Sequence, residues 1–264
     1  MRIWYQSLFA EGSAPGYFNG MAERAASIAR PGVSVHFAGM PPDTYGGQAP
    51  AQVVIYPYLI SLHTQFILDN ALRAQAQGFD VFAIGSVQDP GLEEARSLLD
   101  IPVVAYGEAA MHFACQLSSR FAVLVFQPGF DEIMDRRIRA LGLESRSIPT
   151  VLVDAAFGDV SRALNDPALL VERFSDAARV AIARGAEAII PGQLYLSEAI
   201  ARAGLNRIDE VPVIDALTAT LKMAEVMGDF HHQGIRVTRR GYAHARPSAE
   251  QIAHARRVHG RSDI

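Results

Sequence analysis

The sequence predicts an α/β fold made of two similar lobes, each with a parallel sheet flanked by helices. Short runs rich in β-branched and aromatic residues alternate with helical segments along the 264 residues. Most of these runs are apolar on both faces, which is typical of parallel strands buried between helices. A repeat within the chain indicates that the second lobe is a copy of the first.

The expected strands are apolar runs bounded by Gly, Pro or polar turn residues. They lie, in chain order, at residues 2–5, 33–37, 81–85, 101–106, 121–126, 148–153, 187–192 and 211–215. The expected helices repeat their apolar residues every three or four positions. They lie at residues 22–29, 63–77, 92–99, 108–117, 131–140, 168–184, 196–203 and 216–226.

The repeat pairs a strand and its turn in each half of the chain. "GFDVFAIGS" (78–86) parallels "GAEAIIPGQ" (185–193), and "IPVVAYGEAAMHFA" (101–114) parallels "VPVIDALTATLKMA" (211–224). The repeat places Ser86 and Gln193 at matching strand ends. Ligands bind beyond the carboxyl ends of the strands in open parallel sheets, so we expect these two residues to face one another across a cleft between the lobes.

The repeat also predicts how the chain divides. One lobe is expected to contain residues 1–100 with about 215–230, the second residues 101–214, and residues 231–264 form a basic C-terminal tail. The segment 38–60 is a long connection rich in Pro and Gly, typical of a lid or an interface. The tail is expected to be solvated or packed on a neighbouring subunit, with a local contact to an anion or nucleic acid as the alternative.

Composition points to a small-molecule substrate. The net charge is −4 with 20% charged residues, so neither nucleic acid nor a membrane surface is an expected partner. Cys115 is the only cysteine, which excludes an intrachain disulfide and favours the cytoplasm. The chain shows no signal peptide or spanning apolar run, no dinucleotide or phosphate-loop motif, and no spacing typical of metal ligands. We expect a homo-oligomer.

Three motifs carry a resemblance to a known family. They are Asp89-Pro90-Gly91-Leu92, Gly107-Glu108-Ala109 and Val211-Pro212-Val213-Ile214-Asp215. Over most of residues 78–226 the chain resembles the Asp/Glu/hydantoin racemase superfamily, and within it the hydantoin racemase-like branch. The resemblance implies a two-lobed pseudo-dimer that acts without a cofactor on a carbon next to a carboxylate or carbonyl. In typical members two cysteines, one from each lobe, exchange the proton of that carbon.

This chain departs from the family at both thiol positions, where Ser86 and Gln193 stand. A serine hydroxyl is far less acidic than a thiol and needs a partner base, and an amide does not titrate. Two-thiol racemisation is therefore excluded. Ser86 is interpreted as a hydroxyl that binds substrate, as a nucleophile or as a plain turn residue, and Gln193 as an amide donor to substrate. Cys115 is expected to pack in the interior.

A replacement base is expected from a helix start. Glu108 and His112 are four residues apart, so they share a helix face and could act as an oriented acid–base pair. The alternatives are a carboxylate that complements the helix dipole and a histidine satisfied in the interior. Asp89 precedes Pro90 and is expected to cap the helix that follows it.

Five further residues are candidates for substrate binding. Gln6 and Ser7 follow the first strand at the same edge of the sheet, although they do not match the Asn-Pro-Asn type of sequence usual in the family. Tyr56 and Tyr58 lie in a Pro-containing loop, where their rings could orient a substrate ring or simply pack. Tyr195 is two residues beyond Gln193.

The sequence thus predicts a cofactor-independent racemase or isomerase that works by acid–base chemistry on an amino-acid derivative or a cyclic amide. Decarboxylation, elimination and C–N hydrolysis remain alternatives, because the same turns could stabilise an enolate-like oxyanion. Two other hypotheses remain: a protein that binds a carboxylate or amide without turnover, and an enzyme in which Ser86 forms an acyl adduct.

Overall fold

The computed structural model describes residues 1–12, 15–163 and 165–261. Its first sheet consists of β1 (Arg2–Ala10), β2 (Ser34–Met40), β3 (Val81–Gly85) and β4 (Val103–Ala105). The strands are parallel and ordered β2-β1-β3-β4, with Ser7 of β1 opposite Gly85 of β3. This order brings the ends of β1 and β3, where the candidate residues lie, side by side.

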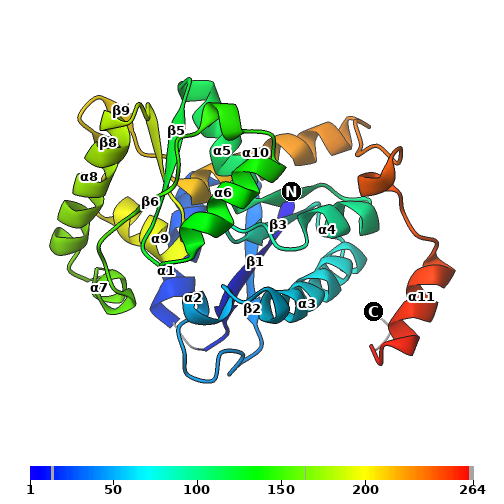
Figure 1. Cartoon of the computed structure of the whole chain (residues 1–264). Coiled ribbons are helices and arrows are strands. Elements are labelled where there is room, and N and C mark those ends of the chain that lie inside the picture. Colours follow the sequence, from blue (N-terminus) through cyan, green and yellow to red (C-terminus); the bar gives the residue numbers. More distant parts are fainter. Residues whose placement is uncertain (13–14, 164, 262–264) are drawn as a thin grey trace.

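A second parallel sheet repeats this arrangement (Figure 1). It consists of β5 (Phe121–Val125), β6 (Val151–Leu152) and β7 (Ala188–Pro191), ordered β6-β5-β7. A parallel bridge from Ile189 to Val213 adds a fourth position beside β7, where the first sheet has β4. The two lobes with parallel sheets and the internal duplication predicted from the sequence are therefore confirmed.

Helices flank both sheets. They are α1 (Pro15–Ile28), α2 (Pro50–Val53), α3 (Pro57–Ala76), α4 (Leu92–Leu98), α5 (Tyr106–Leu117), α6 (Phe130–Ala140), α7 (Phe157–Arg162), α8 (Ala168–Ala183), α9 (Leu194–Arg202), α10 (Ala216–His232) and α11 (Ala249–Val258). Two 3₁₀ turns, η1 (Glu144–Arg146) and η2 (Tyr242–His244), and a short antiparallel hairpin of β8 (Arg207–Ile208) with β9 (Val211–Pro212) complete the elements.

The two lobes exchange one helix each. Helix α5 leaves β4 of the first sheet and packs on β7 and β5 of the second, whereas α10 leaves the second sheet and packs on β3 and β4. The predicted lobe boundary between residues 100 and 101 is wrong, because β4 pairs with β3 and belongs to the first sheet. The chain crosses to the second lobe only after Ala105.

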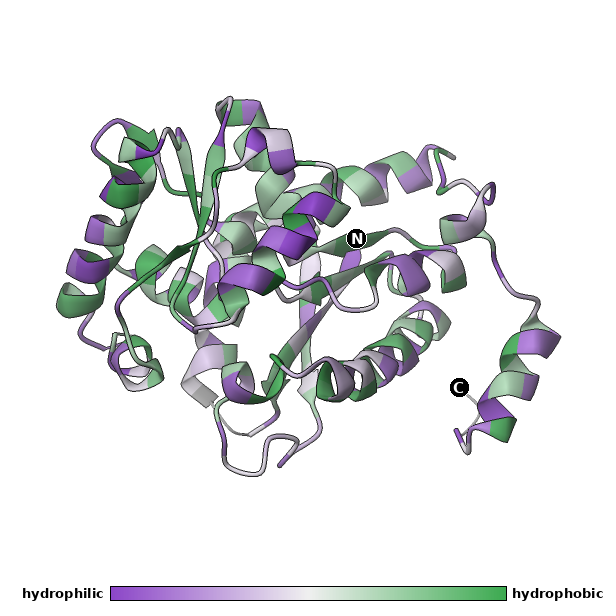
Figure 2. Cartoon of the chain, in the orientation of Figure 1, coloured by the Kyte–Doolittle hydropathy of each residue, from purple (hydrophilic) through white to green (hydrophobic). Residues whose placement is uncertain are grey.

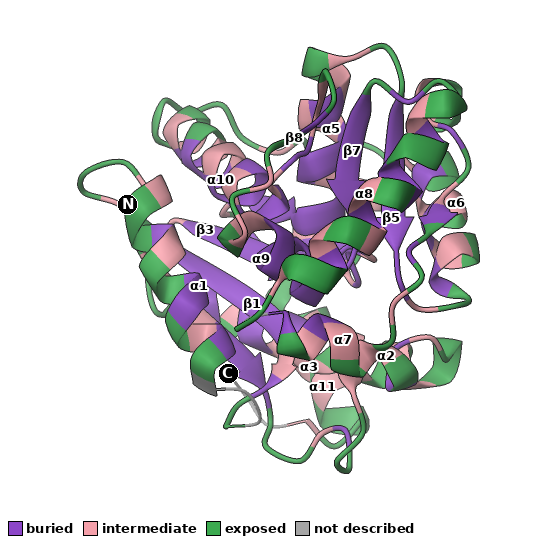
Figure 3. Cartoon of the chain, turned by 90° about the vertical axis from the view of Figure 1, so that its left-hand side faces the viewer, coloured by how far each residue is buried: buried purple, intermediate pink, exposed green. Residues whose placement is uncertain are grey.

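The strands form the buried interior of both lobes. Figure 2 shows them as mainly hydrophobic, with the hydrophilic residues concentrated on the outer faces of the helices. Figure 3 shows β1, β3, β5 and β7 as buried. All residues of β3, β5 and β7 are buried, as expected for parallel strands covered on both faces. None of the described helices is long and apolar enough to cross a bilayer.

Several elements differ from the sequence prediction. The connection 38–60 contains the end of β2, the short helix α2 and the start of α3. The basic tail follows a longer α10 and carries α11, which projects from the body of the molecule in Figure 1. Ion pairs fasten the tail to the first lobe: Arg239 and Arg246 bind Asp100, and Arg256 and Arg261 bind Asp69.

Candidate active site

Ser86 and Gln193 line one small cavity between the lobes, with a volume of about 70 Å³. Ser86 follows β3 and Gln193 follows β7, so each stands at the carboxyl end of a strand. The rest of the lining is mainly apolar and includes Leu8, Phe126 and Phe130. We call this space the inner cavity.

A glycine precedes each of the two residues because the strand ends pass close to a neighbouring strand. A Cβ atom on Gly85 would lie 2.3 Å from the Tyr5 ring of β1. A Cβ atom on Gly192 would lie 2.7 Å from Val123 of β5. Only glycine fits at such distances without a shift of the neighbouring residues. The turns that carry Ser86 and Gln193 therefore both begin with a glycine packed closely against the adjacent strand.

The amide group of Gln193 has one fixed end and one open end. Its Oε1 accepts a hydrogen bond of 2.7 Å from the backbone N–H of Phe126, which determines how the amide is oriented. Its Nε2 is buried and has no hydrogen-bond partner among the described residues. A buried donor without an acceptor is costly, so this side chain is suited to hydrogen-bonding an oxygen atom of a ligand.

The hydroxyl of Ser86 is less constrained. Its Oγ accepts a long hydrogen bond of 3.4 Å from the backbone N–H of Gln88, and the residue is half-buried. The hydroxyl proton therefore stays available for a ligand or for transfer. Among the described residues that line the inner cavity, Ser86 has the only aliphatic hydroxyl, and Tyr195 has the only phenol.

Stacked aromatic rings separate the inner cavity from a wider outer groove of about 660 Å³. The Tyr195 ring stacks on Phe9 at 4.6 Å and on Phe157 at 5.6 Å, between ring centroids. Phe9, Pro50, Phe157 and Tyr195 line both spaces. Burial raises the pKa of Tyr195 above its usual value, so its phenol stays protonated at neutral pH and can donate a hydrogen bond.

Glu108 and His112 are not among the residues that line the inner cavity. Both carboxylate oxygens of Glu108 accept hydrogen bonds from Arg96, at 3.0 and 2.5 Å. Burial alone would raise the pKa of Glu108, but the hydrogen bonds and charge of Arg96 hold it below its usual value. Arg96 thus holds the Glu108 carboxylate away from the inner cavity, and the acid–base pair with His112 stays a prediction.

Asp89 caps a different helix from the one predicted. Gly91 is the cap of α4, whereas the Asp89 carboxylate accepts hydrogen bonds from Gly107 N–H at 2.7 Å and Glu108 N–H at 2.9 Å, at the start of α5. It also accepts one of 3.0 Å from Nε of Arg137 in α6. Burial raises the pKa of Asp89 to about 7, although Arg137 acts in the opposite direction.

Gln6 and Ser7 are structural in this fold. Gln6 donates to the backbone carbonyls of Ser7 and Gly39, both at 3.0 Å, and accepts from Asn70, so no donor remains for a ligand. Ser7 is fully buried, and its Oγ accepts from Phe9 N–H. The next residues of β1, Leu8 and Phe9, line the inner cavity in their place, and a contact of Gln6 and Ser7 with substrate stays a prediction.

Tyr56 and Tyr58 also lie away from the inner cavity. Their exposed fractions are 55% and 72%, and they flank Pro57 at the start of α3. Neither residue lines the inner cavity, so their role in substrate binding stays a prediction. Cys115 in α5 packs partly buried against the core, which agrees with its predicted packing role.

Of the aromatic residues that line the inner cavity, Tyr195 was predicted from the sequence, whereas Phe9, Phe126, Phe130 and Phe157 were not. Phe126 directly follows β5, and Phe9 is the last residue but one of β1. Strands β1 and β5 occupy the same position in the order of their sheets. An extension of the repeat to these two strands could have pointed to both residues. Phe157 begins α7, a short helix that has no counterpart in the repeat, and no pattern in the sequence marks it.

Comparisons with known proteins agree with this architecture. The chain is 28% identical over 181 residues to the hydantoin racemase of Pseudomonas sp. (strain NS671), which covers 68% of this chain and 70% of that protein. It is 32% identical over 162 residues to the hydantoin racemase of Rhizobium meliloti, covering 61% and 65% of the two chains.

Solved structures resemble the fold over nearly the whole chain. The allantoin racemase from Klebsiella pneumoniae has a TM-score of 0.75 and 24% identity, with 94% of each chain covered. The allantoin racemase from Pseudomonas fluorescens has a TM-score of 0.72 and 25% identity, with 94% of this chain and 97% of that chain covered. The family model described as Asp/Glu/Hydantoin racemase matches residues 13–224, so this chain belongs to the Asp/Glu/hydantoin racemase family.

Proposed function

We propose that the inner cavity binds the carbonyl oxygen of a small cyclic amide or amino-acid derivative, and that the protein moves the proton of the carbon next to it. The observation that carries this proposal is the unpartnered Nε2 of Gln193, held by the bond from Phe126 N–H to Oε1. The similar hydantoin and allantoin racemases support a reaction of the racemase or isomerase type.

The polar groups of the inner cavity suit an enolate-like intermediate. Loss of a proton beside a carbonyl places negative charge on the carbonyl oxygen. The Gln193 amide and the first N–H groups of α9 are fixed donors that would stabilise this charge in an apolar surrounding. No donor has to reorient when the charge forms, which is the main advantage of such a site.

The described residues that line the inner cavity supply proton donors but no acceptor for the proton of the carbon, so a hydroxide ion from solvent is expected to take up that proton and become water. Ser86 then returns a proton to the carbon and regains its own from water. A two-faced exchange needs a group that gains and loses a proton on each side of the carbon, and the amide of Gln193 does neither. Ser86 and Tyr195 supply hydroxyl protons, and no described residue that lines the inner cavity carries a carboxylate, imidazole, amine or thiol. The mechanism therefore differs from a symmetrical two-thiol exchange.

The same lack of a base favours a second candidate, decarboxylation of a malonate-type substrate. Loss of carbon dioxide generates the enolate without removal of a proton, so it requires only the oxyanion donors and one proton donor. An apolar cavity also destabilises the departing carboxylate relative to water. Ser86 would then deliver the proton.

Proton NMR in D₂O with hydantoins, N-carbamoyl amino acids, amino acids and malonates tests both candidates. Wild-type protein is expected to introduce deuterium at the carbon next to the carbonyl, or to release carbon dioxide from a malonate. Ser86→Ala should abolish the reaction, and Gln193→Ala should weaken it about tenfold, because one hydrogen bond to the carbonyl is lost.

Three results would contradict the proposal. Exchange that survives Ser86→Ala would move the proton carrier elsewhere. An acyl adduct on Ser86 in the mass spectrum would indicate nucleophilic chemistry. Compounds that raise the melting temperature without changing chemically would indicate a binding protein.

A further inference from the structure

Two arginines occupy equivalent places in the two lobes. Arg24 lies in α1, which follows β1, and Arg137 lies in α6, which follows β5. Each binds a carboxylate at the start of the helix that the lobes exchange: Arg24 binds Asp215, and Arg137 binds Asp89. Asp215 accepts from Leu217 N–H of α10, as Asp89 accepts from Glu108 N–H of α5. The duplication has thus produced the same unit twice.

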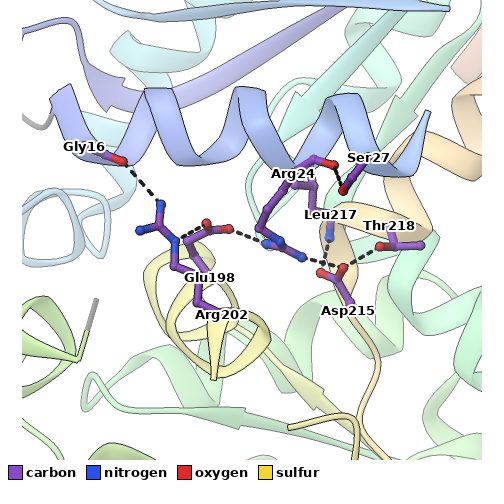
Figure 4. A network of polar contacts seen from close by, with 8 residues as sticks. All are labelled: Gly16, Arg24, Ser27, Glu198, Arg202, Asp215, Leu217 and Thr218. Carbon is purple, nitrogen blue, oxygen red and sulfur yellow. Dashed lines mark hydrogen bonds and ion pairs between the residues drawn. The ribbon is translucent and has the colours of Figure 1, made fainter. Parts of the chain in front are cut away.

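The unit around Arg24 contains a second, deeply buried carboxylate (Figure 4). The Glu198 side chain is 1% exposed, and its two oxygens accept from Arg24 and, at 2.7 Å, from Nε of Arg202. Arg202 also donates to the carbonyl of Gly16 at the start of α1. Helix α1 is therefore tied to α9 near both of its ends, through Arg24 and Gly16.

This network lies one turn from the inner cavity. Gln193 immediately precedes α9, and its carbonyl accepts a hydrogen bond of 2.9 Å from the N–H of Ser197, the residue before Glu198. Tyr195 stacks on Tyr17 of α1, with ring centroids 5.4 Å apart. A shift of α9 relative to α1 would therefore move the Gln193 amide and the Tyr195 ring.

The unit around Arg137 is connected to the other side of the inner cavity. Asp89 N–H donates to the carbonyl of Ser86 at 3.0 Å. Asp89 has a φ of 50°, a left-handed conformation that is unfavourable for most residues with a side chain. The bonds from Arg137, Gly107 and Glu108 to its carboxylate hold this conformation and so fix the turn that carries Ser86.

We propose that Arg24 and Arg137 are equivalent positioning residues, each of which sets one side of the inner cavity. Arg24, through Glu198, positions Gln193 and Tyr195, and Arg137, through Asp89, positions Ser86. Neither arginine lines the inner cavity. A neutral replacement of Arg137 removes the arginine that binds the buried Asp89, and Arg24→Gln leaves the buried Glu198 with Arg202 as its remaining arginine partner. In each case the buried carboxylate loses part of its stabilisation, and the adjoining segment is expected to shift.

The separation of the two sides can be measured in the whole protein by NMR. The reporters are the side-chain amide of Gln193, assigned by its loss in Gln193→Ala, and the backbone amide of Ser86. Arg24→Gln is expected to shift the Gln193 signal and leave the Ser86 signal in place, and Arg137→Gln is expected to do the reverse. Arg179→Gln, at an arginine that is 56% exposed in α8, is the control and should change neither signal.

Conservative variants keep the test decisive if a Gln variant fails to fold. Arg24→Lys and Arg137→Lys retain the charge but lose the planar fork that binds two groups at once, so each should give a smaller shift of the same signal. Equal shifts of both signals in each variant would overturn the proposal. So would an unchanged Gln193 signal in a folded Arg24 variant.

The effect on turnover rests on the proposed function. With a substrate identified there, Arg24→Gln should lower activity about tenfold in the wild-type background and much less in Gln193→Ala, because it acts through Gln193. Equal losses in both backgrounds would overturn the positioning role. If no compound reacts, the proposed function fails, while the NMR result still decides where each arginine acts.

Discussion

The Ser86 side and the Gln193 side of the inner cavity share a frame and differ in their chemistry. Each begins with a glycine at a strand end and is braced by an arginine that binds a carboxylate at the start of an exchanged helix. Ser86 has a hydroxyl that could carry a proton, whereas Gln193 has an amide that cannot. The duplicated frame therefore does not require duplicated chemistry.

The two sides also use their carboxylates differently. Asp89 is in the loop that follows Ser86, and its fully buried side chain alone binds both the helix start and the arginine. On the Gln193 side two carboxylates share these contacts. Asp215, which is 29% exposed, caps α10, and the buried Glu198 lies in the helix that follows Gln193. We expect the Ser86 side to be the less tolerant of change.

Making the two sides chemically alike should have the largest effect. In the double variant Ser86→Cys with Gln193→Cys, each side carries a thiol with a reference pKa near 8.5 that a helix start can lower. Proton exchange at the carbon next to the carbonyl is expected to rise about 1,000-fold over wild type, measured by deuterium uptake. The product should also lose its optical purity, because protons can now arrive on both faces.

The single variants are the controls for this comparison. Ser86→Cys alone should increase exchange while the substrate keeps its configuration, since only one face gains a thiol. Racemisation by Ser86→Cys alone would show that the Gln193 side already delivers protons. Inactivity of the double variant with intact binding would mean that the two side chains do not flank the reacting carbon.

The sequence predicted most of the frame and only part of the site. Periodicity and the repeat identified the parallel strands and brought Ser86 and Gln193 to one cavity, because strand ends meet wherever two such sheets face each other. The partners of charged side chains were not predictable. Glu108 pairs with Arg96 and Asp89 with Arg137 through contacts between distant segments, and no local pattern encodes such contacts.

Two glycines test how tolerant each side is. A Cβ atom on Gly107 would lie 2.3 Å from the carbonyl oxygen of Val87 and 2.9 Å from the Asp89 carboxylate. Gly107→Ala must therefore displace the backbone at Val87 or at position 107. We expect it to lower the free energy of unfolding by about 3 kcal/mol, measured by urea denaturation.

Gly20 in α1 provides the comparison on the Gln193 side. A Cβ atom there would meet only the end of the flexible Arg202 side chain, and alanine favours a helix more than glycine does. Gly20→Ala should therefore change the free energy of unfolding by less than ~1 kcal/mol. Equal losses at Gly107 and Gly20 would remove the contrast between the two sides.

The last comparison concerns the dependence of stability on pH. Because burial raises the pKa of Asp89 to about 7, the folded protein retains a proton that the unfolded chain releases near pH ~4. Folding is then favoured at low pH, and Asp89 should lower the free energy of unfolding by at most ~1.4 kcal/mol per unit as the pH rises from about 4 to about 7. Asp89→Asn should remove this slope, whereas Asp215→Asn should keep it, because Asp89 still produces it. The carbon-13 shift of the Asp89 carboxyl group measures its titration directly. A midpoint near 4 would mean that Arg137 and the α5 N–H groups outweigh burial, and the Ser86 side would then be anchored by an ionised carboxylate throughout the physiological range.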